Sequence, residues 1–176
     1  MKRATTGLLI IDLQRGMFSG SEQPYQGEII LDRVAGLLRQ ARSHGLPVFH
    51  VQHDGGPGDV LGKPSAGWEI HPAVRPVAGE PIIEKTVCSA FQGTDLHDRL
   101  GAKGIGRLII AGMQTEYCID TTCRAAFGFG YQTVLVGDAH TTFDAPGLTA
   151  AQIIAHHNRT LKGSFVELTE SSAVAF

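Results

Sequence analysis

Cysteine and long apolar stretches are both scarce in this sequence. It contains three cysteines, and an odd number without a secretory leader is typical of a reducing compartment in which thiols stay free. The first apolar run, Leu8 to Ile11, is too short for a signal sequence or a membrane span, and Asp12 interrupts it. We therefore expect a cytoplasmic protein that does not cross a membrane.

Runs of one charge are missing as well. The 15 basic and 17 acidic residues are scattered along the chain and leave a formal net charge of −2. Nucleic acids and anionic membranes are usually bound by clustered Lys and Arg, so we expect neither as a partner.

Apolar residues make up 43% of the 176 residues, and the mean hydropathy is +0.02. This composition indicates a soluble globular protein, and the length suits one domain with a full core. No internal repeat or low-complexity tract divides the sequence. We therefore predict a single domain over residues 1–176.

Short apolar runs alternate with longer segments of helical periodicity, which is typical of a parallel sheet with crossover helices. The fold class that we predict is α/β, with three α/β/α layers and a six-stranded, mainly parallel sheet of the Rossmann-like kind. The Gly- and Pro-rich segment 54–79 is too long for a simple connection, so we expect it to be functional or mobile. The expected strands are 7–13, 47–52, 81–84, 107–111, 131–136 and 164–168, and the expected helices are 28–42, 94–100, 119–129 and 149–161.

Asp12, Lys85 and Cys118 each follow an apolar run at its C-terminal end. Ligands of such folds bind outside the carboxyl ends of the strands, so one crevice could hold all three side chains. A carboxylate can accept a thiol proton, an ammonium can stabilise the resulting anion, and a thiolate can attack a carbonyl carbon. Each residue also has an ordinary structural explanation, but the coincidence of the three favours a catalytic site.

Cys118 lies between a strand-like run, Arg107 to Ala111, and a stretch of helical composition. A cysteine that opens a helix feels the positive end of the helix dipole, which favours the thiolate. We therefore expect a lowered thiol pKa at Cys118. The other two cysteines, Cys88 and Cys123, have no partner at a metal-ligand spacing, and we expect both to be packing residues.

Four stretches of the sequence resemble the isochorismatase-like cysteine hydrolase superfamily. They are LLIIDLQRGMF near the start, EKTVCSAFQGTDL in the middle, and LIIAGMQTEYCIDTTCRAAFGFGY followed by VLVGDAHTT towards the end. The resemblance implies a catalytic triad of Asp12, Lys85 and Cys118. It also implies a cis peptide bond between Met113 and Gln114, with the N–H groups of Gln114 and Cys118 forming an oxyanion hole.

The resemblance further implies the strand order 3-2-1-4-5-6, no cofactor, a small-molecule substrate and a homo-oligomer, either a dimer or a tetramer. In that order the third strand is not beside the first, so Lys85 must reach inward from the edge of the sheet or from the segment after its strand. Aromatic residues line the pocket in this family, which makes Phe18, Trp68 and Phe91 candidate substrate-binding residues. Thr115 is a fourth candidate. Packing in the core explains the three aromatic residues almost as well.

Metal-dependent members of this superfamily carry an Asp-x-His pair after the second strand, whereas this chain has HVQHDGG there. His50 and His53 are three residues apart, which places them on opposite faces of an extended strand, and Asp54 is adjacent rather than correctly spaced. We therefore expect no metal site. The departure also weakens any case for nicotinamide as the substrate.

Together these features predict an enzyme, a cysteine hydrolase that cleaves a carbon–nitrogen bond of an amide, ureido or carbamoyl group through a thioester. Two alternatives on the same fold stay open. One is an isochorismatase-type vinyl ether hydrolase, although such members need no nucleophilic cysteine, and the other is a catalytically silent small-molecule-binding protein. A phosphoacceptor receiver domain is disfavoured because Asp12 has no acidic residue paired with it after the first strand.

Overall fold

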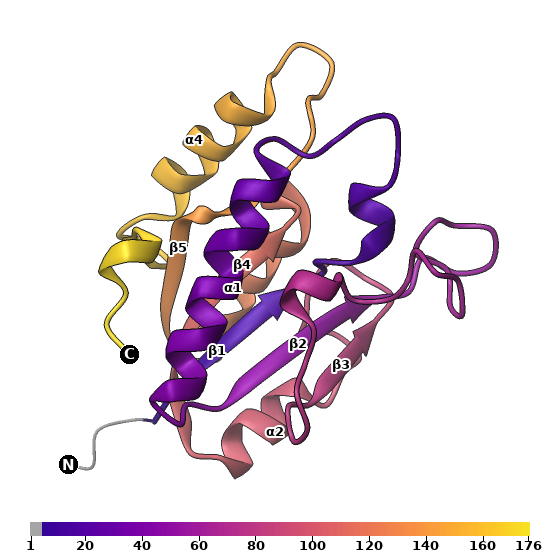
Figure 1. Ribbon diagram of the computed structural model, residues 1–176. Helices are drawn as coiled ribbons and strands as arrows, with labels where there is room; N and C mark the ends of the chain where they lie inside the picture. Colours follow the sequence, from indigo (N-terminus) through magenta and orange to yellow (C-terminus); the bar gives the residue numbers. More distant parts are fainter. Residues whose placement is uncertain (1–4) are drawn as a thin grey trace.

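The computed structural model describes residues 5–176 and places a central sheet between helices on both faces (Figure 1). The strands are β1 (Thr5–Ile11), β2 (Val48–His53), β3 (Ile82–Lys85), β4 (Ile105–Met113), β5 (Gln132–Thr141) and β6 (Glu167–Thr169). The helices are α1 (Gly27–Ser43), α2 (Leu96–Ala102), α3 (Asp120–Gly128) and α4 (Ala150–Leu161), and short 3-10 or π-helical turns cover 15–18, 72–74, 115–119 and 171–173.

The six strands pair in the order β3-β2-β1-β4-β5-β6, which confirms the predicted order, and every pair is parallel. β1 lies at the centre, where Leu8 is beside Val48 of β2 and Ile109 of β4. A strand that is covered on both faces needs apolar side chains on both. The run Leu8 to Ile11 supplies them, since none of its residues is more than 2% exposed.

The alternation of side chains along β1 divides the core into two parts. Leu8 and Ile10 pack with α1 on one face of the sheet, and Leu9 and Ile11 pack with α2 and α3 on the other. In Figure 1, α1 crosses in front of the strands, whereas α2 lies below them at the opposite layer. The two layers of helices therefore cover the two faces of the sheet.

α1 is an amphipathic helix of 17 residues. Its buried positions recur every three or four residues, as a helix with one face on the sheet requires. They are Ile30, Leu31, Val34, Leu37, Leu38 and Ala41. The chain then turns at Gly45, whose φ of +67° is a left-handed conformation that glycine adopts without strain. No helix within residues 5–176 is long and apolar enough to cross a membrane.

β4 and β5 both extend beyond their predicted ends. The apolar runs stop at Ala111 and Val136, but the pairing resumes after a register shift, with Gly112 beside His140 and Met113 beside Thr141. Backbone hydrogen bonding does not depend on apolar side chains, so the two apolar runs underestimated the length of both strands. The extension carries the sheet up to the turn that holds the predicted nucleophile.

The long segment 54–79 runs beside the residues that follow β1. The N–H groups of Arg15 and Gly16 donate to the carbonyl oxygens of Glu69 and Gly67, each at 2.8 Å. These bonds hold the segment against the carboxyl end of the central strand, where the predicted site lies.

Candidate active site

The structure brings the three predicted catalytic side chains together at the carboxyl ends of the strands. Asp12 directly follows β1, Lys85 is the last residue of β3, and Cys118 lies in the π-helical turn after β4. Lys85 Nζ is 2.7 Å from Asp12 Oδ2 and 3.1 Å from Cys118 Sγ. Lys85 therefore reaches inward across the end of β2, as the strand order requires.

The ammonium of Lys85 is completely enclosed by the protein, with a side-chain exposure of 0%. Besides Asp12 and Cys118, it lies 3.0 Å from the carbonyl oxygen of Val87 and 3.3 Å from His53 Nδ1. An ammonium has three N–H bonds, so four acceptors surround three protons. These four contacts fix the position of the ammonium.

Asp12 presents its two carboxylate oxygens to different surroundings. Oδ2 is paired with Lys85, whereas Oδ1 is buried and has no hydrogen-bond partner within residues 5–176. The backbone of Asp12 has a φ of +51°, a left-handed conformation that aspartate tolerates better than most residues. Oδ1 is thus the atom of the pair that remains available to take a proton.

The pKa of the Cys118 thiol is raised rather than lowered. The prediction of a lowered pKa, which assumed that Cys118 opens a helix, is wrong. Burial, the largest cause, and the negative charge of Asp12 raise the pKa of the Cys118 thiol to about 12, while Lys85 offsets only part of the rise. The turn begins at Thr115, so Cys118 is its fourth residue rather than its first. The resting site consequently holds a neutral thiol beside an ion pair.

Burial also raises the pKa of the Asp12 carboxyl, although the charge of Lys85 acts in the opposite direction. At Lys85 burial lowers the pKa, but Asp12 and Cys118 outweigh it, and the net pKa is raised. The lysine therefore remains an ammonium. A raised carboxyl pKa makes Asp12 a stronger base than an exposed aspartate.

The turn from β4 to Cys118 is held tightly against β1. The Met113–Gln114 peptide bond is cis, and Gly112 before it has a φ of +134°. A Cβ atom on Gly112 would collide with the backbone of Ile11, so only glycine allows the two strands to approach this closely. Beyond the turn, the carbonyl of Gln114 accepts the N–H of Ile119 at 3.1 Å.

A cavity of about 300 Å³ opens onto the three catalytic candidates. Its wall is mainly apolar, and it includes the turn residue Gln114, whose N–H was expected in the oxyanion hole. The residues that line it are Asp12, Met17, His53, Leu61, Cys88, Met113, Gln114, Tyr117 and Cys118. Cys88, which the sequence suggested was a packing residue, is exposed and lies on this wall.

The predicted aromatic residues do not line this cavity. The ring of Phe18 lies 5.2 Å from that of His71, and Phe91 is 7% exposed in the core. Trp68 lies under the ammonium of Lys63, at 4.8 Å from Nζ to the ring centroid. The surroundings of these three residues fit the alternative explanation, which was that their rings serve packing.

Thr115, the fourth substrate-binding candidate, is also buried rather than placed on the cavity wall. It is 0% exposed, and its Oγ1 lies 2.8 Å from His140 Nδ1. His140 Nε2 lies 2.8 Å from Asn158 Oδ1. Thr115 therefore anchors the π-helical turn to the interior.

Two residues of the site were missed or misread in the sequence. Gln14 is 0% exposed, and its side chain brackets the backbone of His53, accepting its N–H at 2.9 Å and donating to its carbonyl at 2.8 Å. His53 was considered only as a metal ligand, but it lines the cavity beside Lys85, whereas His50 lies apart and contacts Glu80 at 2.9 Å. The position of Gln14, two residues after Asp12, was the available signal.

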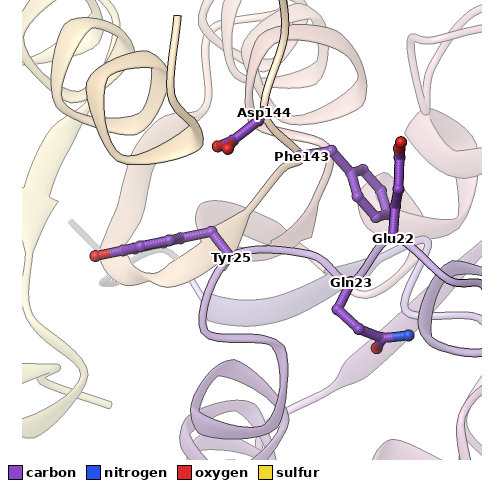
Figure 2. Close-up of a pocket in the computed structure, with 5 residues that line it drawn as sticks. All are labelled: Glu22, Gln23, Tyr25, Phe143 and Asp144. Carbon is purple, nitrogen blue, oxygen red and sulfur yellow. The ribbon is translucent and has the colours of Figure 1, made fainter.

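A second cavity, of about 350 Å³, lies between the chain before α1 and the chain after β5, away from these residues. Figure 2 shows that the side chains around it point in different directions, with Tyr25 directed away from Glu22 and Gln23. The carboxylate of Asp144 is already engaged, since Oδ1 accepts the N–H of Ala150 at 2.7 Å. This second cavity contains none of the predicted catalytic residues.

The isochorismatase domain family matches residues 6–169 of the chain. A streptothricin hydrolase of Streptomyces noursei is 40% identical over 139 residues, which cover 79% of this chain and 50% of that protein. The chain therefore spans about half the length of this relative. The maleamate amidohydrolase of Pseudomonas putida is 31% identical over 157 residues, which cover 76% of this chain and 73% of that protein.

The same family is found among solved structures. The crystal structure of an isochorismatase family protein superposes with a TM-score of 0.88 and 36% sequence identity, covering 94% of this chain and 98% of that chain. The family model and the structural superposition agree over nearly the whole length of the described chain, and the chain belongs to the isochorismatase family of hydrolases.

Proposed function

We propose that this protein hydrolyses a carbon–nitrogen bond of a small amide, ureido or carbamoyl compound through a thioester on Cys118. The observation that carries the proposal is the convergence of three groups. Lys85 Nζ contacts both Asp12 Oδ2 and Cys118 Sγ at the wall of one cavity. A thiol, a base and a fixed cation are the groups that acyl transfer through cysteine needs.

The first half of the reaction forms the acyl-enzyme. Oδ1 of Asp12 accepts the thiol proton as the sulfur of Cys118 attacks the carbonyl carbon. The N–H groups of Gln114 and Cys118 hold the negative oxygen of the tetrahedral intermediate. The carbon–nitrogen bond then breaks, Asp12 gives its proton to the leaving nitrogen, and the amine departs from the thioester.

The second half releases the acid. Asp12, again a carboxylate, accepts a proton from water as the water oxygen attacks the thioester carbon. The carbon–sulfur bond breaks, and Asp12 returns the proton to sulfur. One carboxylate thus serves as base and acid in both halves.

Lys85 moves no proton in this scheme. Its ammonium compensates the charge of Asp12 in the resting enzyme and that of the sulfur during attack. Because burial and the charge of Asp12 raise the pKa of the Cys118 thiol, the resting thiol is neutral, and its proton passes to Asp12 before or during attack. Because the ammonium is already in place, moving negative charge between Asp12 and the Cys118 sulfur requires little rearrangement of the surrounding groups.

The relatives support hydrolysis of this kind. One is named as a maleamate amidohydrolase, and an amidohydrolase cleaves a carbon–nitrogen bond. Another is named as a streptothricin hydrolase.

Ammonia release from a panel of small amides and ureides tests the proposal, with Cys118→Ala as the blank. We expect at least one compound to be hydrolysed by the wild type and by no more than background with the variant. Turnover that survives in Cys118→Ala would overturn the thioester. Binding without turnover across the panel would instead favour a silent small-molecule-binding protein.

A further inference from the structure

His53 is held between the catalytic lysine and the cavity. Its Nδ1 lies 3.3 Å from Lys85 Nζ, and its ring forms part of the cavity wall. An ammonium can only donate, so Nδ1 must be the acceptor of this contact, and the ring proton must be on Nε2. Burial and the charge of Lys85 lower the pKa of His53, which keeps the imidazole neutral with this one tautomer.

The backbone of His53 is fixed by a buried side chain. Gln14 accepts the His53 N–H and donates to the His53 carbonyl, at 2.9 and 2.8 Å, and it also donates to the carbonyl of Trp68 at 2.8 Å. A glutamine that satisfies both backbone groups of one residue holds that residue in place. Gln14 therefore fixes the backbone of His53, and the contact between Nδ1 and Lys85 positions its ring.

The Nε2–H of His53 is left without a protein partner. No acceptor for Nε2 lies within hydrogen-bonding distance among residues 5–176, and the atom is not one of the buried, unpaired polar atoms. It is consequently accessible, on a ring that lines the cavity. A neutral donor that is accessible at this position can bind an acceptor atom of the substrate.

Within residues 5–176, no cationic side chain on the wall of the cavity is free to pair with a negatively charged substituent. No Arg lines it, and the protons of Lys85 are directed to four protein acceptors, so none is left for a carboxylate of the substrate. The charge of Asp12 is matched by Lys85. An anion placed in this cavity would be desolvated without a cationic partner, which is costly, whereas an uncharged amide loses little.

We propose that His53 is a substrate-binding residue that donates its Nε2–H to an uncharged acceptor, and that the protein therefore takes uncharged amides in preference to amides that carry a carboxylate. This inference rests on the proposed function and names the substrate class of that same site. It also separates this chain from a hydrolase of maleamate, which is an anionic amide.

Titration of Cys118→Ala, labelled with 15N in its imidazole rings and with 13C in its methionine methyl groups, tests the proposal without turnover. The two probes are succinamide, which is uncharged, and succinamate, which has the same carbon skeleton and one carboxylate. We expect succinamide to move the Nε2–H signal of His53 downfield and to bind at least about tenfold more tightly than succinamate. Shifts at Met113 without a shift at His53, equal binding of the two probes, or no shift at all would each overturn the proposal.

Two variants separate substrate binding from support of Lys85. His53→Gln keeps an acceptor for Lys85 and an N–H donor, whereas His53→Phe keeps the ring but has neither. We expect kcat/KM for an uncharged amide to fall about tenfold to hundredfold in His53→Phe and to be largely restored in His53→Gln. The reaction of Cys118 with methyl methanethiosulfonate, which carries no amide, should follow the wild-type pH profile in both.

An exposed histidine of α4 supplies the matched control. His156→Gln should leave kcat/KM unchanged, because this residue lies outside the cavity. Equal losses in both His53 variants, with a shifted pH profile of Cys118, would show that His53 only supports Lys85 and would overturn the proposal. Failure of the proposed function can be distinguished from failure of this proposal. If only the proposed function is wrong, the wild type releases no ammonia, but the His53 signal still shifts on titration.

Discussion

Asp12 and Lys85 meet through one carboxylate oxygen only. Oδ2 of Asp12 is 2.7 Å from Lys85 Nζ, while Oδ1 is buried and unpaired among the residues that the structure describes. A buried acceptor without a partner costs free energy, so its presence in a carboxylate that interacts with the Cys118 thiol points to use during reaction. The geometry allows the carboxylate to stay in its ion pair and still accept a proton.

Replacement of Asp12 should separate thiol reactivity from turnover. In Asp12→Asn the negative charge that raises the Cys118 pKa is gone, so the thiol should react faster with methyl methanethiosulfonate near neutral pH. Turnover should fall by about two to four orders of magnitude, because the base and acid is lost. Both rates are measured against pH in a Cys88→Ser background, since Cys88 is exposed. A parallel fall in both rates would mean that Asp12 only positions the site.

Removal of Lys85 should destabilise the fold as well as the thiolate. Lys85→Met leaves the buried charge of Asp12 unpaired, and we expect the free energy of unfolding to fall by about 3–5 kcal/mol. The double variant Asp12→Asn/Lys85→Met should recover part of this loss, because it leaves no unpaired charge. Urea unfolding of the wild type, Asp12→Asn, Lys85→Met and the double variant measures the coupling free energy between the two side chains. If the double variant is no more stable than Lys85→Met, the ion pair is not the cause.

His140 should make stability depend on pH. Burial lowers the pKa of His140 to about 4, below its ordinary value of 6.5, so between these values the unfolded chain binds a proton that the folded chain does not. The contribution is present in full above about pH 6.5 and is lost as the pH falls towards about 4, for a total of about 3 kcal/mol. Urea unfolding over this range should give a shallower slope for His140→Gln than for the wild type. The exposed control His156→Gln should keep the wild-type slope, and equal slopes in all three proteins would contradict the assignment.

Gly112 should tolerate no side chain. In Gly112→Ala the added Cβ would meet the carbonyl oxygen of Ile11, and a φ of +134° is unfavourable for alanine. We expect a loss of several kcal/mol, on the order of a large core disruption, in the free energy of unfolding. Gly101→Ala is the matched control, because a Cβ there meets nothing within 4 Å. A Gly112→Ala protein as stable as the control would show that β1 and β4 can separate at this point.

The catalytic candidates could be predicted because each stands at the end of an apolar run, and parallel strands bring such ends to one edge. The inward reach of Lys85 also followed from the strand order. The pKa of Cys118 could not be predicted from the sequence, since it depends on burial and on the distance to Asp12 rather than on the position in a helix. Such quantities arise only when separate segments meet.

The residues around the triad were harder to predict for the same reason. Phe91 is an aromatic residue in a family motif, but its ring packs 5.1 Å from that of Phe129, in the core. Composition does not distinguish a ring in a core from a ring on a cavity wall. Gln14 and His53 form a contact between residues 39 positions apart, and the position of Gln14 after Asp12 did not reveal this partner.

Detection of an acyl group on Cys118 tests the central claim most directly. The wild type is mixed with a hydrolysed amide from the panel, quenched in acid within one turnover, and analysed by mass spectrometry, with hydroxylamine added in a parallel sample to intercept the thioester. We expect an adduct with the mass of the acyl group on the Cys118 peptide, and a hydroxamate in place of part of the acid product. Turnover that yields neither the adduct at any time nor the hydroxamate would contradict the thioester mechanism.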